Sequence, residues 1–277
     1  MPGIEQMMNN HFFDQLSIEL QFLLTFVLMV LMLELGFHFG RRKQVKPVKA
    51  QTAQVRALMG AMLGLLAFML AFTFSVAQTH FENRVQFQID ESILAKNAFM
   101  QADLAVEPVR TRSRELLLEF VDGRVKLNEL VRQKREQELF QLLKRAEDIH
   151  LELWSLATGS QQPPGTEGTG GSGNDELINS VLRLMDMQTL RVQAALVNRI
   201  PVIIWLTLYF TALMSMVVVG YQAGLTEKRS PVATFSLVLA FSAVMALIMD
   251  LDRPLQSLFS LDVGVMEHLA TFMRSVQ

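Results

Sequence analysis

The 277-residue sequence contains no cysteine, which excludes disulfide bonds, thiolate nucleophiles and zinc–cysteine sites. Histidine is scarce as well, with five residues scattered along the chain. The formal net charge is only −2, so bulk charge does not favour binding to nucleic acid. Phosphate-binding glycine loops, nucleophile elbows, HExxH helices and dinucleotide fingerprints are also absent from the sequence. We therefore expect no enzyme activity, no cofactor, no metal site and no nucleic-acid partner.

Charged residues are distributed unevenly along the chain. Of the 25 basic and 27 acidic residues, 33 lie between positions 80 and 199. Four apolar windows are long enough to cross the hydrocarbon core of a bilayer as helices, at 18–39, 57–79, 200–220 and 232–249. The sequence therefore predicts an all-α membrane protein with four transmembrane helices and long amphipathic helices that project from the membrane.

These windows divide the chain into five regions. We expect an N-terminal tail at 1–17, the first two transmembrane helices at 18–79 with a basic loop at 40–56, an extramembrane helical domain at 80–199, the last two transmembrane helices at 200–249 and a C-terminal tail at 250–277. Within the helical domain, the charged run 132–138 is either one solvated turn of a long helix or the tip of a helical hairpin. The Gly/Ser-rich stretch 159–175 is typical of a flexible linker.

Basic residues in the short loops indicate the orientation. The loop between the first two transmembrane helices and the loop between the last two hold eight Lys and Arg residues, against two in the two tails together. Short loops rich in Lys and Arg stay in the cytoplasm. We therefore expect both termini and the central helical domain on the outer side of the membrane.

Glycines recur at a spacing of four residues near the cytoplasmic ends of the expected helices. The three pairs are Gly36 with Gly40, Gly60 with Gly64, and Gly220 with Gly224. Small residues at this spacing let helix backbones approach closely inside a membrane. We interpret the three pairs as helix-packing positions.

The second transmembrane helix ends in a stretch rich in phenylalanine and hydroxyl side chains. The residues concerned are Phe68, Phe72, Thr73, Phe74 and Ser75. One interpretation is a hydrophobic constriction that gates a pore by dewetting. The other is ordinary packing of these side chains against lipid and neighbouring helices.

Ionisable residues also occur inside or at the ends of the expected spans. Glu34 and His38 lie one helical turn apart, which suits a proton or ion relay. The alternative is an interfacial Glu34 that snorkels or pairs with Arg41, Arg42 or Arg56. Asp252 and Arg253 precede a helix-ending proline. They form either a selectivity ring in an oligomer or a structural salt bridge to Glu82, Arg84, Asp90 or Glu91.

Several short blocks together resemble the bacterial bestrophin-like membrane protein family. The blocks are ELG at 34–36, GRR at 40–42, LAFTFS at 70–75, RIP at 199–201, GYQAG at 220–224 and DLDRP at 250–254, together with the stretch 90–108. Ser257 stands where a glycine is expected soon after the proline. The resemblance implies a channel similar to bestrophins, which are pentameric anion channels with a neck lined by phenylalanine and isoleucine.

We therefore expect a multi-pass protein of the bacterial inner membrane whose central domain is periplasmic. The leading interpretation is a homo-oligomeric pore for small ions, pentameric by analogy, with the second transmembrane helix lining the path. The alternative is a membrane scaffold or sensor whose helical domain binds a partner. A proton-coupled transporter that uses Glu34 is the third hypothesis, although no inverted repeat of broken helices is visible in the sequence.

Overall fold

A computed structural model describes residues 17–42, 49–133, 135–159, 171–196, 199–226, 230–253 and 264–276. All regular structure in these ranges is helical, which confirms the predicted all-α fold. Four helical stretches are long and apolar enough to cross a membrane, as predicted: Ile18–Arg42, Thr52–Ala102, Val202–Thr226 and Pro231–Asp252. They correspond to α2 (Ile18–Arg42), most of α3 (Lys49–Ala102), α7 (Val202–Thr226) and α8 (Pro231–Asp252).

The chain divides into two compact units. Unit 1 comprises 1–81 and 198–253, and unit 2 comprises 82–197 and 254–277. Helix α3 belongs to unit 1 as far as Phe81 and to unit 2 from Glu82 onward. Hydropathy places the end of the second transmembrane helix near 79. Helix α3 continues past this point without a break, because the residues beyond it keep the helical pattern of apolar positions.

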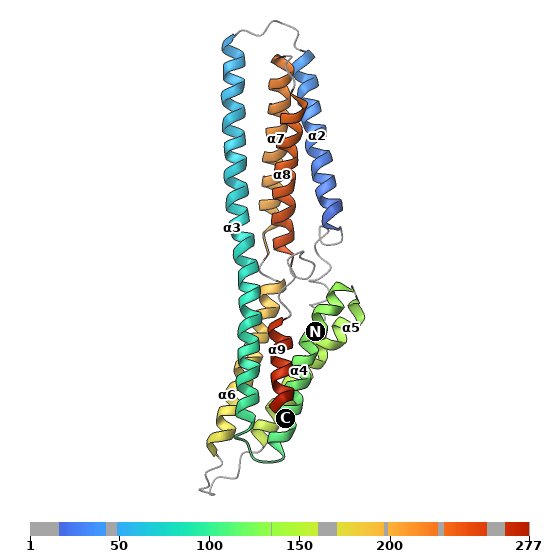
Figure 1. Cartoon of the computed structure of the whole chain (residues 1–277). Helices are drawn as coiled ribbons and strands as arrows, with labels where there is room; N and C mark the ends of the chain where they lie inside the picture. Colours follow the sequence, from blue (N-terminus) through green and yellow to red (C-terminus); the bar gives the residue numbers. More distant parts are fainter. Residues whose placement is uncertain are drawn as a thin grey trace. The chain divides into compact units, whose positions relative to one another are not determined.

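Unit 1 contains α2, α7, α8 and the first part of α3. Helix α2 packs against α7 and α8, and these three helices lie side by side in Figure 1. Its core consists of apolar side chains from all four helices, among them Met29, Leu66, Leu208 and Met245. Many other large apolar side chains point outward, as the apolar solvent of a membrane allows. Several hydroxyl groups in the spans donate to the preceding turn of their own helix, as Thr73 does to the Met69 carbonyl over 2.7 Å.

Unit 2 is a helical bundle with its own core. Helices α4 (Val109–Arg132) and α5 (Glu136–Gly159) are separate and pack on each other, so the charged run 132–138 lies at the tip of a helical hairpin. Two ion pairs join them, Glu119 with Arg145 and Arg112 with Glu152, each over 2.7 Å. Helix α6 (Gly171–Leu196) packs against α5. Most of the expected linker, residues 160–170, lies outside the described residues.

The region that the sequence left as a C-terminal tail contributes a helix to unit 2. Helix α9 (Gly264–Val276) lies beside α4, where Figure 1 shows it in dark red. Its buried residues, Met266, Leu269, Ala270 and Met273, recur at three- and four-residue steps and join the core of the unit. Arg274 adds an ion pair to Asp122 on α4 over 2.6 Å. The amphipathic pattern of α9 explains why this segment folds back onto the bundle.

Candidate functional site

Two of the three glycine pairs form the contact between α2 and α7. A Cβ atom built on Gly36 would overlap the carbonyl oxygen of Val217, and one built on Gly220 would overlap that of Leu33. Gly40 and Gly224 face each other one turn further along. The backbones therefore touch directly, and any side chain at these positions would push the two helices apart.

The third pair lies on a different surface. A Cβ atom built on Gly60 or Gly64 would meet no described atom within 4 Å. Phe68 and Phe72 follow at four-residue steps from Gly64 and have exposed fractions of 70% and 59%. Gly60, Gly64, Phe68 and Phe72 therefore lie on a face of α3 that the described residues of the chain leave uncovered.

The remaining residues of the predicted constriction point elsewhere. Thr73 is buried, and Phe74 packs against the core of unit 1. Ser75 is exposed, on the same side of α3 as Phe68 and Phe72. The structure therefore separates the phenylalanine-rich stretch into a core side and an exposed side, which the sequence pattern alone left together.

Glu34 and His38 are in contact on α2, but through the backbone. The His38 ring nitrogen Nδ1 lies 3.0 Å from the main-chain carbonyl oxygen of Glu34. A carbonyl oxygen only accepts, so Nδ1 is the protonated nitrogen in this contact. The carboxylate of Glu34 takes no part in this hydrogen bond.

Asp252 joins three segments of unit 1. Its Oδ1 atom accepts a hydrogen bond from the backbone N–H of Ile200 over 3.1 Å and lies 3.8 Å from Nδ1 of His80 on α3. The sequence did not single out His80. Arg253 is buried at the end of α8, and Glu91, one of the expected salt-bridge partners, has other partners within unit 2.

Unit 2 contains a buried ionic cluster that the sequence pattern does not predict. Glu91 of α3 is fully buried and binds Arg124 of α4 over 2.9 Å, and it also pairs with Arg191 of α6. Burial lowers the pKa of each arginine to about 10. The signal that could have revealed it is Arg124 itself, a charge set among apolar residues at helical spacing.

His150 of α5 lies next to this cluster. Its ring centroid is 5.0 Å from that of Phe120, and the Arg124 guanidinium carbon is 4.9 Å from the same ring. Burial and then the positive charge of Arg124 lower the pKa of His150 to about 4. The imidazole is therefore neutral at pH 7.

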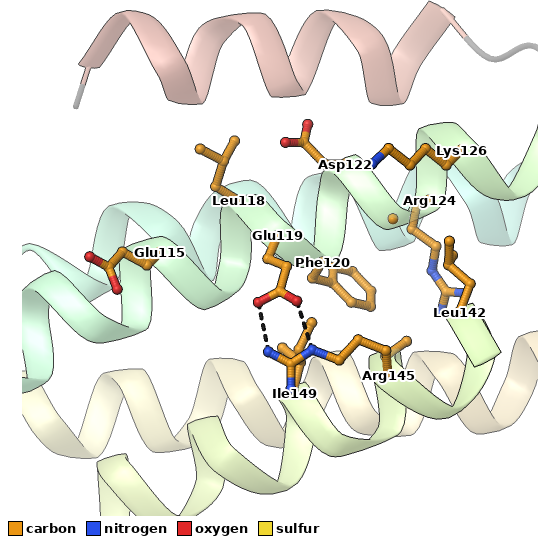
Figure 2. Close-up of a pocket in the computed structure, with 12 residues that line it drawn as sticks. Glu115, Leu118, Glu119, Phe120, Asp122, Arg124, Lys126, Leu142, Arg145 and Ile149 are labelled. Carbon is orange, nitrogen blue, oxygen red and sulfur yellow. Dashed lines mark hydrogen bonds and ion pairs between the residues drawn. The ribbon is translucent and has the colours of Figure 1, made fainter.

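A pocket of about 440 Å³ opens between α4 and α5 beside the cluster. Figure 2 shows Glu119 and Arg145 joined across it by two hydrogen bonds, both 2.7 Å long. Phe120, Arg124, Leu142 and Ile149 also line the pocket. Within the residues described, no group of three or more His, Cys, Asp or Glu residues is arranged to hold a metal ion.

Four apolar spans, close backbone packing inside unit 1 and a polar helical bundle define an all-helical integral membrane protein. A model of the Bestrophin-like domain matches residues 23–263, and the chain belongs to this family. The fold is also similar to the crystal structure of a mutated bacterial bestrophin homolog from Klebsiella pneumoniae, with a TM-score of 0.52 and 12% sequence identity over 93% of this chain and 98% of that one. No curated protein matches the sequence.

Proposed function

We propose that the protein is a homo-oligomeric pore for small ions in which α3 lines the path. The observation that carries this proposal is the exposure of Phe68 and Phe72 on one face of a membrane-spanning helix, in line with Gly60 and Gly64. In an oligomer with this face at the central axis, aromatic rings from several copies form a narrow apolar constriction. Such a constriction gates by dewetting.

Membership of the Bestrophin-like family supports a channel-like assembly. By analogy with bestrophins, we propose a pentamer embedded in the bacterial inner membrane. The count of basic residues in the short loops supports a periplasmic position for residues 80–199. Asp252 and Arg253 then lie at the outer end of the spans. The bond between Asp252 and Ile200 favours a structural role for Asp252 over a selectivity ring.

A second candidate function is a scaffold or sensor whose unit 2 binds a partner protein. The observation in its favour is the exposure of Leu104 and Val106, two apolar side chains between α3 and α4. In water such side chains mark interaction surfaces only when they form part of a larger patch. The pore therefore remains our leading proposal.

Ion flux through liposomes that contain the purified protein tests the pore directly. Phe72→Ala widens the proposed constriction and should raise the flux, because a wider apolar neck wets more readily. Phe210→Ala is the matched control, since Phe210 on α7 is 65% exposed and lies outside the proposed path. The control should leave the flux unchanged.

The thermal stability and oligomer size of each variant separate a leaky pore from misfolded protein. Well-folded oligomers of the wild type and of Phe72→Ala that both pass no small ion, at any voltage or pH, would exclude the pore. A protein that is monomeric or dimeric in detergent and passes no ions in liposomes would favour the scaffold.

A further inference from the structure

Three segments of unit 1 meet at the end of the spans that lies away from the basic loop 40–56. Asp252, the last residue of α8, accepts a hydrogen bond of 3.1 Å from the backbone N–H of Ile200, which precedes α7. The same oxygen, Oδ1, lies 3.8 Å from Nδ1 of His80 on α3, which is too long for a hydrogen bond. Asp252 therefore joins α8 to the start of α7 and leaves α3 just short of a bond.

The ring nitrogen of His80 that faces Asp252 is buried. It has no hydrogen-bond partner in the part of the chain that the structure describes. A neutral imidazole with its proton on Nε2 presents a lone pair at Nδ1, and two lone pairs that face each other do not attract. The imidazolium form carries a proton on both nitrogens, so Nδ1 can then donate to the carboxylate and the opposite charges attract. The separation of 3.8 Å fits the neutral form.

The other ionisable groups near this contact balance one another. They are Glu19 at the start of α2, Arg199 before α7, Asp250 and Arg253 at the end of α8, and Glu82 and Arg84 on α3 itself. Three of them are acidic and three are basic, so together they add no net charge. Asp252 is the carboxylate that lies within 4 Å of the His80 ring, and it therefore decides how the contact responds to a proton.

We propose that His80 and Asp252 form an acid-sensitive latch between α3 and the adjoining ends of α7 and α8. Protonation of His80 closes the gap of 3.8 Å into a charge-assisted hydrogen bond of about 2.8 Å and draws α3 toward the junction of Asp252 with Ile200. Loss of the proton opens the contact again. Under the orientation proposed above, this end of unit 1 faces the periplasm, so the latch responds to the pH outside the cytoplasm.

Helix α3 is also the helix that lines the path in the pore that we propose. It runs without a break from Phe72 to His80, so a change in how His80 is held reaches the exposed phenylalanines. In that pore, ion flux would depend on the pH at this end of the spans. This consequence rests on the proposed function, whereas the latch itself does not.

Solid-state NMR of the full-length protein in lipid bilayers tests the latch directly. Histidine is labelled with ¹⁵N and aspartate with ¹³C at the carboxyl carbon, and His80→Gln assigns the His80 signal. Imidazole side chains change charge between about pH 8 and about pH 5. Over this range, the dipolar coupling between Nδ1 of His80 and the carboxyl carbon of Asp252 should increase, because the gap closes by about 1 Å.

Asp252→Asn separates the charge of this side chain from its structural bond. The amide oxygen of asparagine can still accept the hydrogen bond from Ile200, but it carries no negative charge to attract an imidazolium. With ¹³C-labelled asparagine, the coupling in this variant should stay weak at both pH values. His38→Gln is the matched control, because His38 is an exposed histidine of α2 that contacts the Glu34 carbonyl, and this variant should retain the response.

A coupling that is equal at both pH values in the wild type would overturn the latch, and so would the same increase in Asp252→Asn. Ion flux in the same bilayers is a separate measurement. Flux that changes with pH in the wild type but not in Asp252→Asn would link the latch to the pore. A change in coupling without flux at either pH would support the latch and count against the proposed pore.

Discussion

Gly40 of α2 and Gly224 of α7 meet backbone to backbone. A Cβ atom built on Gly40 would lie 3.1 Å from the Cα of Gly224, and one built on Gly224 would lie 3.0 Å from the Cα of Gly40. Neither backbone can move away without breaking the contact along the whole helix pair. This reciprocal fit makes the glycines of α2 and α7 the most sensitive positions in unit 1.

Alanine at these contacts should destabilise unit 1. Gly220→Ala brings its Cβ within 2.9 Å of the Phe37 backbone nitrogen, and we expect a loss of about 3 kcal/mol or more in the free energy of unfolding. Gly64→Ala is the control, because a Cβ there meets no atom of the described residues within 4 Å. The measurement is the yield and thermal midpoint of detergent-purified protein. Equal stability of the two variants would contradict the close packing.

A larger residue at Gly64 tests a different relationship. Gly64→Leu should leave the fold of the single chain intact, because no atom of the ranges that the structure describes lies within 4 Å of a Cβ at this position. If α3 packs against other copies, the variant should lose its oligomeric state while its helical content stays the same. Light scattering and circular dichroism of the same sample distinguish the two effects. An unchanged oligomer would exclude Gly64 from an interface between copies.

Removal of the buried carboxylate should destabilise unit 2. Glu91→Gln leaves Arg124 and Arg191 without their counter-ion, and breaking a buried pair in this way costs about 3–5 kcal/mol. Glu119→Gln breaks an exposed pair with Arg145 and should cost at most about 1 kcal/mol. Thermal midpoints in detergent compare the two. A triple variant with methionine at 91, 124 and 191 should recover stability, because it removes every buried charge of the cluster.

The stability of unit 2 should depend on pH through His150. Its pKa is lowered to about 4 in the folded state, from the ordinary imidazole value of 6.5, so between pH 6.5 and pH 4 the unfolded chain binds a proton that the folded chain does not. The free energy of unfolding is therefore highest above pH 6.5. It decreases as the pH falls, by about 3 kcal/mol in total by pH 4.

The charged group that acts on His150 is Arg124 from α4, which is itself paired with Glu91 from α3. His150→Gln should flatten the pH dependence, and His268→Gln on the surface of α9 should not. Thermal midpoints from pH 7 to pH 4 give the comparison. Parallel curves for the wild type and His150→Gln would show that His150 does not carry this dependence.

Single cysteines on this cysteine-free background test the orientation. A membrane-impermeant thiol reagent added to intact cells should label Gly165→Cys and leave Lys46→Cys unlabelled, because the basic loop is expected in the cytoplasm. Permeabilised cells, in which both positions should react, provide the control. The opposite labelling pattern would place residues 80–199 in the cytoplasm.

The sequence by itself determined the four spans, because the hydropathy of about 20 consecutive residues is a local property that requires no partner. It also determined the helical character of unit 2 through the periodicity of its apolar residues. For the charged run 132–138, it left two possibilities open, and the packing of α4 on α5 decided for the hairpin.

Only the tertiary structure decided which residues meet. The three glycine pairs look alike in sequence, yet two of them join α2 to α7 and the third, Gly60 with Gly64, lies on an uncovered face of α3. Glu91, Arg124 and Arg191 are far apart in the chain, and helix rotation and register bring them together. Local patterns show which face of a helix is apolar. The neighbouring helix that this face contacts depends on how all the helices pack at once, and that information is spread over the whole chain.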